Sequence, residues 1–194
     1  MIEGTTIRLR QPADSDLSVL IELRNDQELQ RLLLADWKPN SADDVRAWLK
    51  RRTADVNTFF AVIADQETDQ CCGFIQILGM KPPHHNGSLG IALHESARGR
   101  GYGREAIRLS IQHAIRTSQL RKVTLNVMSG NEAAVGLYRK LGFRIVGTMQ
   151  DHYWNGSHFE DVHVMEQLVS ADYAAVTDDL NAAAASTSSA RNAA

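Results

Sequence analysis

The feature that most constrains this chain is a run of alternating glycines between a strand-like segment and a helix-like segment. Gly99, Gly101 and Gly103 are each separated by one larger residue. The apolar segment 89–93 before them has the composition of a β-strand, and apolar residues recur at helical spacing over 107–115. The sequence therefore predicts a strand, a glycine-rich loop and a helix in direct succession.

This arrangement is suited to binding phosphate. The first N–H groups of a helix have no partner within the helix and lie at the positive end of its dipole. Glycines leave room for several of these donors to converge on an anion. Arg98, Arg100 and Arg104 add positive charge beside them. We therefore expect a phosphate-binding loop at residues 98–104.

Two common phosphate-binding loops do not fit the pattern. A P-loop needs Lys-Ser or Lys-Thr after its glycines, and neither follows here. A dinucleotide-binding loop needs Gly-x-Gly-x-x-Gly, but Arg104 stands at the third glycine position. The acidic residue expected about 20 positions later is also missing from 119–122. The pattern that remains is Arg-x-x-Gly-x-Gly.

A second motif lies downstream, at residues 131–143. It reads Asn-Glu-Ala-Ala-Val-Gly-Leu-Tyr-Arg-Lys-Leu-Gly-Phe and predicts a short helix that ends at Gly142. Together the two motifs resemble the pyrophosphate loop and the signature Asn-x-x-Ala-x-x-Leu-Tyr-x-x-x-Gly-Phe of the Gcn5-related N-acetyltransferases (GNAT). The resemblance covers roughly residues 7–168, with both motifs in the family's order.

The resemblance implies a three-layer α/β (α+β) fold. Its sheet would be mixed but mostly antiparallel, with about seven strands and a splay between two parallel central strands that end near Leu93 and Val127. Residue patterns place helices after Asp14 or Ser15, after Ser41 and after the glycine loop. The expected strands are 6–10, 59–64, 72–78, a strand ending at 93, 123–127, 144–149 and 159–165.

The resemblance also implies acetyl-coenzyme A as co-substrate. Its pyrophosphate is expected on the loop formed by Arg98, Gly99, Arg100, Gly101, Tyr102, Gly103 and Arg104. Its pantetheine arm is expected along the backbone of Ile91, Ala92 and Leu93, beside Asn126 and Asn131. Tyr138 is the expected catalytic residue, with its hydroxyl group on the departing thiolate.

The implied function is transfer of an acetyl group to a primary amine, by direct attack in a ternary complex. The opening segment 7–17, the Arg24-Asn25-Asp26 turn and segment 156–162 resemble the branch of ribosomal-protein N-terminal and diamine acetyltransferases. The acceptor is then a protein N-terminus, a polyamine or another small amine. The alternative is a catalytically silent acyl-coenzyme A sensor or interaction domain. Tyr138 favours the enzyme, because binding alone needs only the glycine loop.

The residue that deprotonates the acceptor amine is not fixed by any spacing. General bases in proteins are most often histidine or carboxylate side chains within hydrogen-bond reach of the amine or of a bridging water. The candidates are Glu22, Asp26, His94, Glu95 and His152.

Composition argues against several other classes of protein. Lysine and arginine total 21 against 23 acidic residues, so the net charge of −2 gives no sign of nucleic-acid binding. No apolar run is long enough to span a membrane. The adjacent Cys71 and Cys72 are expected to be reduced, and the N-terminus lacks a signal peptide, which favours the cytoplasm. The histidines lack metal-ligand spacing, so we expect no metal. A homodimer is left open.

The chain divides into two parts by composition. Residues 5–169 are expected to form the N-acetyltransferase domain. Residues 170–194 are expected to form a short helix and a flexible tail, because the last residues are almost entirely Ala, Ser, Thr and Asn.

Overall fold

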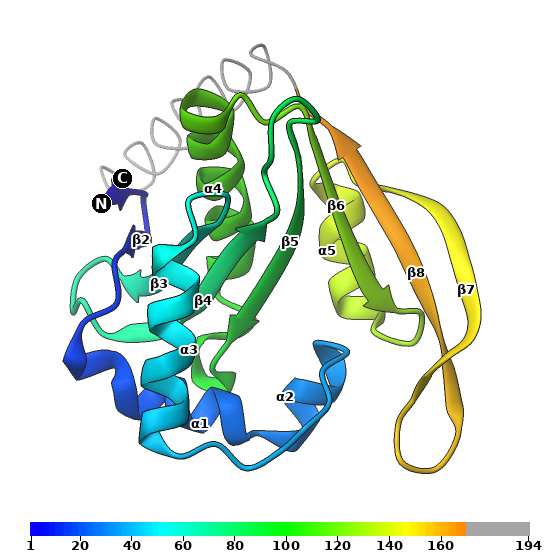
Figure 1. Ribbon diagram of the computed structural model, residues 1–194, viewed down its shortest axis with the longest axis horizontal. Helices are drawn as coiled ribbons and strands as arrows, with labels where there is room; N and C mark the ends of the chain where they lie inside the picture. Colours follow the sequence, from blue (N-terminus) through cyan, green and yellow to red (C-terminus); the bar gives the residue numbers. More distant parts are fainter. Residues whose placement is uncertain (170–194) are drawn as a thin grey trace, which may run out of the picture.

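The computed structural model describes residues 1–169 (Figure 1). The short helix and tail expected at 170–194 lie outside the described residues, so the division of the chain at 169 stays a prediction. The strands are β1 (Ile2–Glu3), β2 (Ile7–Arg10), β3 (Phe59–Asp65), β4 (Cys71–Leu78), β5 (Asn86–Leu93), β6 (Lys122–Met128), β7 (Arg144–Trp154) and β8 (Phe159–Leu168). The helices are α1 (Leu17–Asn25), α2 (Gln27–Leu32), α3 (Ala42–Ala54), α4 (Tyr102–Ser118) and α5 (Glu132–Lys140), with single 3₁₀ turns at η1 (Asp14–Asp16) and η2 (Glu95–Ala97).

All eight strands form one mixed sheet in the order β1-β2-β3-β4-β5-β6-β8-β7. Every neighbouring pair is antiparallel except β5 and β6, which are parallel. The parallel pair is joined through α4, as a crossover between parallel strands requires. This is the expected mixed fold, with one strand more than the predicted seven. The additional strand is β1, a two-residue edge strand that pairs Ile2 with Leu9.

The sheet is covered on both faces, which gives three layers (Figure 1). On one face α1, α2 and α3 bury Leu20, Leu23 and Trp48 against Phe60 and Phe74 of the sheet. On the other face α4 and α5 pack on a larger core. Alternate residues of each strand point to opposite faces, so β3 contributes to both cores. Burial of these side chains is the main force that holds the layers together.

Local sequence signals set most of the helix boundaries. Ser41 caps α3, and Asp44 bonds back to the Ser41 backbone in a capping box, as predicted. Asp26 ends α1 and caps α2, which makes the predicted turn between two helices. The start of α1 differs from the prediction. Asp14 lies in the 3₁₀ turn η1, and α1 begins only at Leu17, because Asp16 instead pairs with Arg10.

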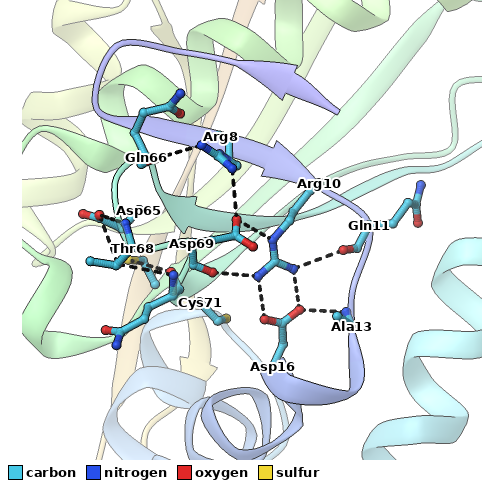
Figure 2. Close-up of polar contacts among 12 residues, drawn as sticks. Arg8, Arg10, Gln11, Ala13, Asp16, Asp65, Gln66, Thr68, Asp69 and Cys71 are labelled. Carbon is cyan, nitrogen blue, oxygen red and sulfur yellow. Dashed lines mark hydrogen bonds and ion pairs between the residues drawn. The ribbon is translucent and has the colours of Figure 1, made fainter.

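The turn between β3 and β4 is bonded to side chains of β2, near the start of the chain (Figure 2). Arg10 of β2 makes two bonds to Asp16, at 2.7 and 2.8 Å, and also bonds Asp69 in the turn. Within the turn, Asp65 accepts hydrogen bonds from the backbone of residues 67 and 68. Paired guanidinium–carboxylate contacts of this kind have a fixed geometry. The turn, and with it Asp65, is therefore held in one position.

Strands β5 and β6 separate partway along their length (Figure 1). Their pairing covers only Asn86, Gly87 and Ser88, opposite residues 122–124. Beyond that point β5 continues to pair with β4 as far as Leu93, and β6 with β8 as far as Met128. The backbone edges of β5 and β6 that face each other are therefore not paired with each other. We call this gap the split, formed by residues 89–93 and 125–128.

Candidate functional site

The glycine loop lies at the N-terminus of α4, beyond the end of β5. Gly99 and Gly101 have φ values of +74° and +84°, in the left-handed region that side chains disfavour. Gly101 is the N-cap of α4, and its cap is not satisfied by any side chain. A Cβ atom on either glycine would meet nothing within 4 Å. The loop therefore presents free helix N–H groups with open space in front of them, which fits a phosphate group.

Tyr102 anchors this loop to the sheet. Its side chain is buried, and its hydroxyl donates a hydrogen bond to Asp65. That bond is the main cause that lowers the pKa of Asp65 to about 2 and raises the pKa of Tyr102 to about 12. Because the Tyr102 side chain is occupied in this way, what it can offer a phosphate is its backbone N–H.

The three arginines of the loop lie in different surroundings. Arg100 stacks over the Tyr102 ring, with Cζ 4.6 Å from the centroid, and lies 3.8 Å from Asp65. Arg98 donates from Nε to the carbonyl of Leu93 at 3.1 Å, which links the loop to the end of β5. Arg104 is exposed on the first turn of α4. All three arginines belong to the loop or to the first turn of α4, so they add positive charge there.

Gly103 brings α4, β5 and α5 together. A Cβ atom at this position would lie 3.4 Å from Leu93, 3.6 Å from Leu137 and 3.8 Å from Ile91. The absence of a side chain at 103 thus lets the first turn of α4 lie against both the split and the helix that carries Tyr138. The two sequence motifs, 28 or more residues apart along the chain, become neighbours here.

Residues 91–93 and Asn126 border the split from its two sides. Ile91 and Leu93 pack toward α4 and α5, whereas Ala92 packs toward α1–α3. Asn126, on β6, has an exposed side chain. Within this segment β5 is bonded along its other edge to β4. On the edge toward the split, residues 89–93 pair with no strand among residues 1–169, and Leu93 O accepts from Arg98; the other backbone groups there could bind an extended ligand as a further strand would.

The motif at 131–143 forms a helix whose two ends are both capped. Asn131 is the N-cap of α5, and its side chain accepts a hydrogen bond from Ala134 N at 3.2 Å. At the other end Phe143 N bonds to Tyr138 O, and Gly142 N bonds to Arg139 O, both at 3.0 Å. This pair of bonds is a Schellman motif, and the Tyr138 and Phe143 rings pack 5.7 Å apart across it. The signature residues therefore hold the Tyr138 ring in place.

Tyr138 is a partly buried residue of α5 that packs against the larger core. Burial raises the pKa of this phenol to about 12. Within residues 1–169 the structure shows no hydrogen bond from its hydroxyl, in contrast to Tyr102 and Tyr153, whose hydroxyls bond to Asp65 and to the carbonyl of Ala35. A buried phenol normally finds a hydrogen-bond partner. An unpartnered one beside the split fits a group whose partner is a ligand.

A cavity of about 370 Å³ opens from the split on the α1–α3 face. Strands β4, β5 and β6 contribute Gln76, Gly90 and Asn126 to its wall, and the helical layer contributes Arg24 and Arg52. Of these only Asn126 was among the predicted site residues. Arg24, Arg52 and Gln76 were missed because they come from three separate elements and form no motif. We call this the acceptor cavity.

None of the five candidate bases lines the acceptor cavity. Asp26 is engaged as the cap of α2, where it accepts from Leu29 N at 3.0 Å. His94 and Glu22 come together, with Nε2 and Oε2 3.5 Å apart, directly after the end of β5. Glu95 and His152 are exposed. Of the five, the structure therefore brings together only His94 and Glu22.

The remaining sequence predictions concern metals, membranes and thiols. In the described part of the chain, no three His, Cys, Asp or Glu side chains cluster as a metal site would need. Among residues 1–169 no helix is both long and apolar enough to cross a bilayer. Cys71 and Cys72 are free thiols, and burial raises the pKa of both, that of Cys71 to about 12. Neither is a reactive thiolate at neutral pH.

Comparisons with known proteins place this arrangement in context. A family model described as an acetyltransferase (GNAT) domain matches residues 6–144. YdaF of Bacillus subtilis (strain 168), named as a ribosomal N-acetyltransferase, is 27% identical over 166 residues, covering 83% of this chain and 90% of the relative. The peptidyl-lysine N-acetyltransferase YjaB of Escherichia coli (strain K12) is 30% identical over 142 residues, covering 73% and 84%.

A solved structure has the same fold. The spermidine N-acetyltransferase from Vibrio cholerae, in complex with CoA and spermine, superposes with a TM-score of 0.78 at 21% identity. The match covers 85% of this chain and 96% of that one.

Proposed function

The chain belongs to the GNAT family of acetyltransferases, and we propose that it transfers an acetyl group from acetyl-coenzyme A to a primary amine. The observation that carries this proposal is the split between β5 and β6, with a glycine-capped helix N-terminus at one side and, close by, the helix α5 with Tyr138, whose hydroxyl has no hydrogen-bond partner among residues 1–169. Binding of CoA by the Vibrio cholerae relative with the same fold supports the choice of co-substrate.

The residues present fit coenzyme A. The N–H groups at the start of α4 would hold the pyrophosphate, in the open space in front of Gly99 and Gly101. The free edge of residues 91–93 would pair with the amides of the pantetheine arm. Acetyl-coenzyme A supplies the reactive thioester when it is bound. Holding it beside the acceptor replaces a bimolecular encounter by a local one, which accounts for a large share of such catalysis.

During the reaction, groups of this chain would stabilise the developing negative charge and take up the amine's proton. As the amine nitrogen bonds to the acetyl carbon, the C–S bond breaks, the amine loses one proton and the sulfur leaves as a thiolate. The backbone N–H near Leu93 would donate to the carbonyl oxygen, where negative charge develops. We propose that His94, paired with Glu22 outside the acceptor cavity, takes up the amine's proton through water.

Tyr138 would stabilise the departing sulfur. A phenol with a pKa of about 12 is a weaker acid than a thiol near 8.5, so complete proton transfer to the thiolate runs uphill by roughly 5 kcal/mol. Hydrogen bonding from the hydroxyl to the developing thiolate, with the proton arriving later from water, is the lower-energy course. The raised pKa keeps the hydroxyl protonated and able to donate.

The test is an acetyl-transfer screen of the purified protein against peptides, polyamines and small amines, read by release of the free thiol. We expect thiol release that depends on both acetyl-coenzyme A and one class of amine. If acetyl-coenzyme A binds but no amine of any class releases thiol above the rate of hydrolysis, the protein is a silent binder and the proposal is wrong.

A further inference from the structure

The acceptor cavity contains two guanidinium groups and no carboxylate. Its charged wall residues are Arg24 from α1 and Arg52 from α3. Most of the other wall residues are apolar or small, and the polar remainder consists of Ser88 and three amides. A cavity in this region of the fold receives the acceptor in our proposal, so its charge bears directly on which amine can enter.

Arg24 is held in position by uncharged groups. Its Cζ lies 5.2 Å from the centroid of the Trp48 ring, a cation–π contact. Its Nη1 donates to Gln30 at 3.3 Å, and its Nη2 lies 3.5 Å from Asn40 Oδ1. Its Nε is buried and has no hydrogen-bond partner among the described residues. The guanidinium is thus fixed in orientation, with its Nε donor unused among the described residues.

Arg52 also has a donor atom without a hydrogen-bond partner among the described residues. Its Nε is also buried without a partner in the described part of the chain. No carboxylate of residues 1–169 lies within ion-pair distance of either guanidinium. By contrast, Arg8, Arg10 and Arg31 each pair with one or two carboxylates. Burial, followed by repulsion from Arg52 and Arg51, lowers the pKa of Arg24.

Two neighbouring, partly buried guanidinium groups repel each other, and among residues 1–169 neither forms an ion pair that would offset this repulsion. A buried donor without a partner keeps its full desolvation cost, and that cost is larger for charged groups. An anion in the cavity, bound by the accessible Nη atoms, would offset the repulsion between the two arginines. A polycation would increase the repulsion.

We infer, resting on the proposed acetyltransferase function, that the acceptor is a small primary amine that also carries an oxyanion, bound by Arg24 and Arg52. The oxyanion is a carboxylate or a phosphonate, since both match the guanidinium fork. The cavity volume of about 370 Å³ is that of a small-molecule site. Trp48 and Phe74, whose rings pack 5.1 Å apart, supply an apolar wall for the body of the ligand.

Gln76 gives the cavity a hydrogen-bond acceptor that complements the arginine donors. Its Oε1 is buried and has no hydrogen-bond partner in the described residues. It lies on β4 opposite Gly90, in the part of β5 that borders the split. An amine N–H is a suitable partner for this oxygen. Arginine donors for the oxyanion and an amide oxygen for the amine together match an amino acid or an aminoalkylphosphonate.

The phosphates of coenzyme A are the alternative partner for the two arginines. The glycine loop at the start of α4 belongs to the opposite layer of the sheet, whereas Arg24 and Arg52 lie on α1 and α3. The loop also has its own arginines at 98, 100 and 104. The arrangement therefore assigns Arg24 and Arg52 to the acceptor.

The test is calorimetry on protein saturated with coenzyme A, where no turnover takes place. The probes are phenylalanine, methionine and leucine, each with its own carboxamide, 2-aminoethylphosphonate with ethanolamine, and spermidine. We expect at least one acid to bind about tenfold or more tightly than its neutral partner, and spermidine to bind weakly. Arg24→Gln and Arg52→Gln should each weaken the acid by about ten- to a hundredfold and leave its neutral partner unchanged.

Three controls separate this effect from damage to the fold. Arg46→Gln removes an exposed charge from the same helix as Arg52 and should change nothing. Arg52→Lys keeps the charge and should recover part of the affinity. The melting temperature and the affinity for acetyl-coenzyme A should be unchanged in all variants.

Three outcomes would overturn the inference. These are carboxamides or spermidine binding as tightly as the acids, acid binding that does not change in the glutamine variants, and variants that lose acetyl-coenzyme A affinity instead. If an acid binds through the arginines but releases no thiol from acetyl-coenzyme A, the anion site stands and the proposed acetyl transfer fails.

Discussion

The two sides of the split are built on different principles. On the proposed coenzyme side, the stretches at 98–103 and 131–143 supply backbone N–H groups and one tyrosine, and residues 91–93 supply a strand edge. On the acceptor side, single side chains from α1, α3, β4 and β6 meet in a cavity. Backbone donors suit a ligand that is the same in every member of a family. Side chains drawn from separate elements can be exchanged one at a time, so this is where an acceptor can be selected.

The largest expected effect is a loss of acetyl-coenzyme A affinity on substitution of Gly101. Gly101→Asp places a carboxylate in the space in front of the helix N-terminus, where phosphate is expected, at a φ of +84°. Repulsion and backbone strain together should lower acetyl-coenzyme A affinity by more than about 100-fold. Gly101→Ala carries the strain without the charge and should lose less than about tenfold. Calorimetry gives the affinities and circular dichroism checks the fold. Equal losses in the two variants would leave no role for a phosphate at this loop.

The second test separates binding from chemistry on the coenzyme side. Tyr138→Phe keeps the ring packed on Phe143 and removes a hydroxyl that has no partner in the described residues, so stability should change little. We expect kcat to fall by about 10²-fold while acetyl-coenzyme A affinity is unchanged. The defect should shrink above about pH 8.5, where the thiolate leaves with less help. The wild-type hydroxyl stays protonated over that range, because its pKa is about 12.

Tyr153→Phe is the matched control for this test. It deletes a hydroxyl outside the motif, which donates to the carbonyl of Ala35 in the wall of the acceptor cavity, so any effect is expected on the KM of the acceptor. Its kcat should stay close to that of the wild type. Wild-type turnover in Tyr138→Phe would remove Tyr138 from the reaction and leave water as the proton source.

The smallest expected effect concerns the support of the glycine loop. Asp65→Asn removes the charge that accepts the Tyr102 hydrogen bond and should lower the melting temperature by a few degrees at pH 7. Folding lowers the pKa of Asp65 from 3.8 to about 2, so its charge stabilises the protein above about pH 4, and this stability is lost as pH falls through 2. The difference between variant and wild type should therefore narrow from pH 4 to pH 2. A difference of constant size over that range would mean that the carboxylate charge is not what holds Tyr102.

The sequence predicted the elements around the glycine loop and the motif at 131–143 well because their signals are local. The helix start at Gly101, the helix end at Gly142 and the strands on either side follow from residues close together in the chain. The exposed edge of β5 could be expected only from the resemblance, since strand pairing is not a local property. The two-residue strand β1 is too short to have a periodicity.

The acceptor cavity could not be predicted in this way. Arg24 and Arg52 are 28 positions apart on two helices, and each alone is typical of a solvated helix face. What distinguishes them is burial of Nε without a counter-ion, which appears only when α1 and α3 pack against the sheet. By sequence, His94 and Glu22 were only two of five candidate bases. The same packing of α1 against the sheet brings them together as a pair.

The central claim is that both substrates occupy the two sides of the split at the same time. Initial rates measured over a grid of acetyl-coenzyme A and acceptor concentrations test it most directly, with the amine identified in the thiol-release screen. We expect double-reciprocal lines that intersect. We also expect no acetylated protein by mass spectrometry when the acceptor is withheld, because Cys71 and Cys72 are protonated at neutral pH. Parallel lines together with an acetyl-enzyme that the amine consumes would contradict it.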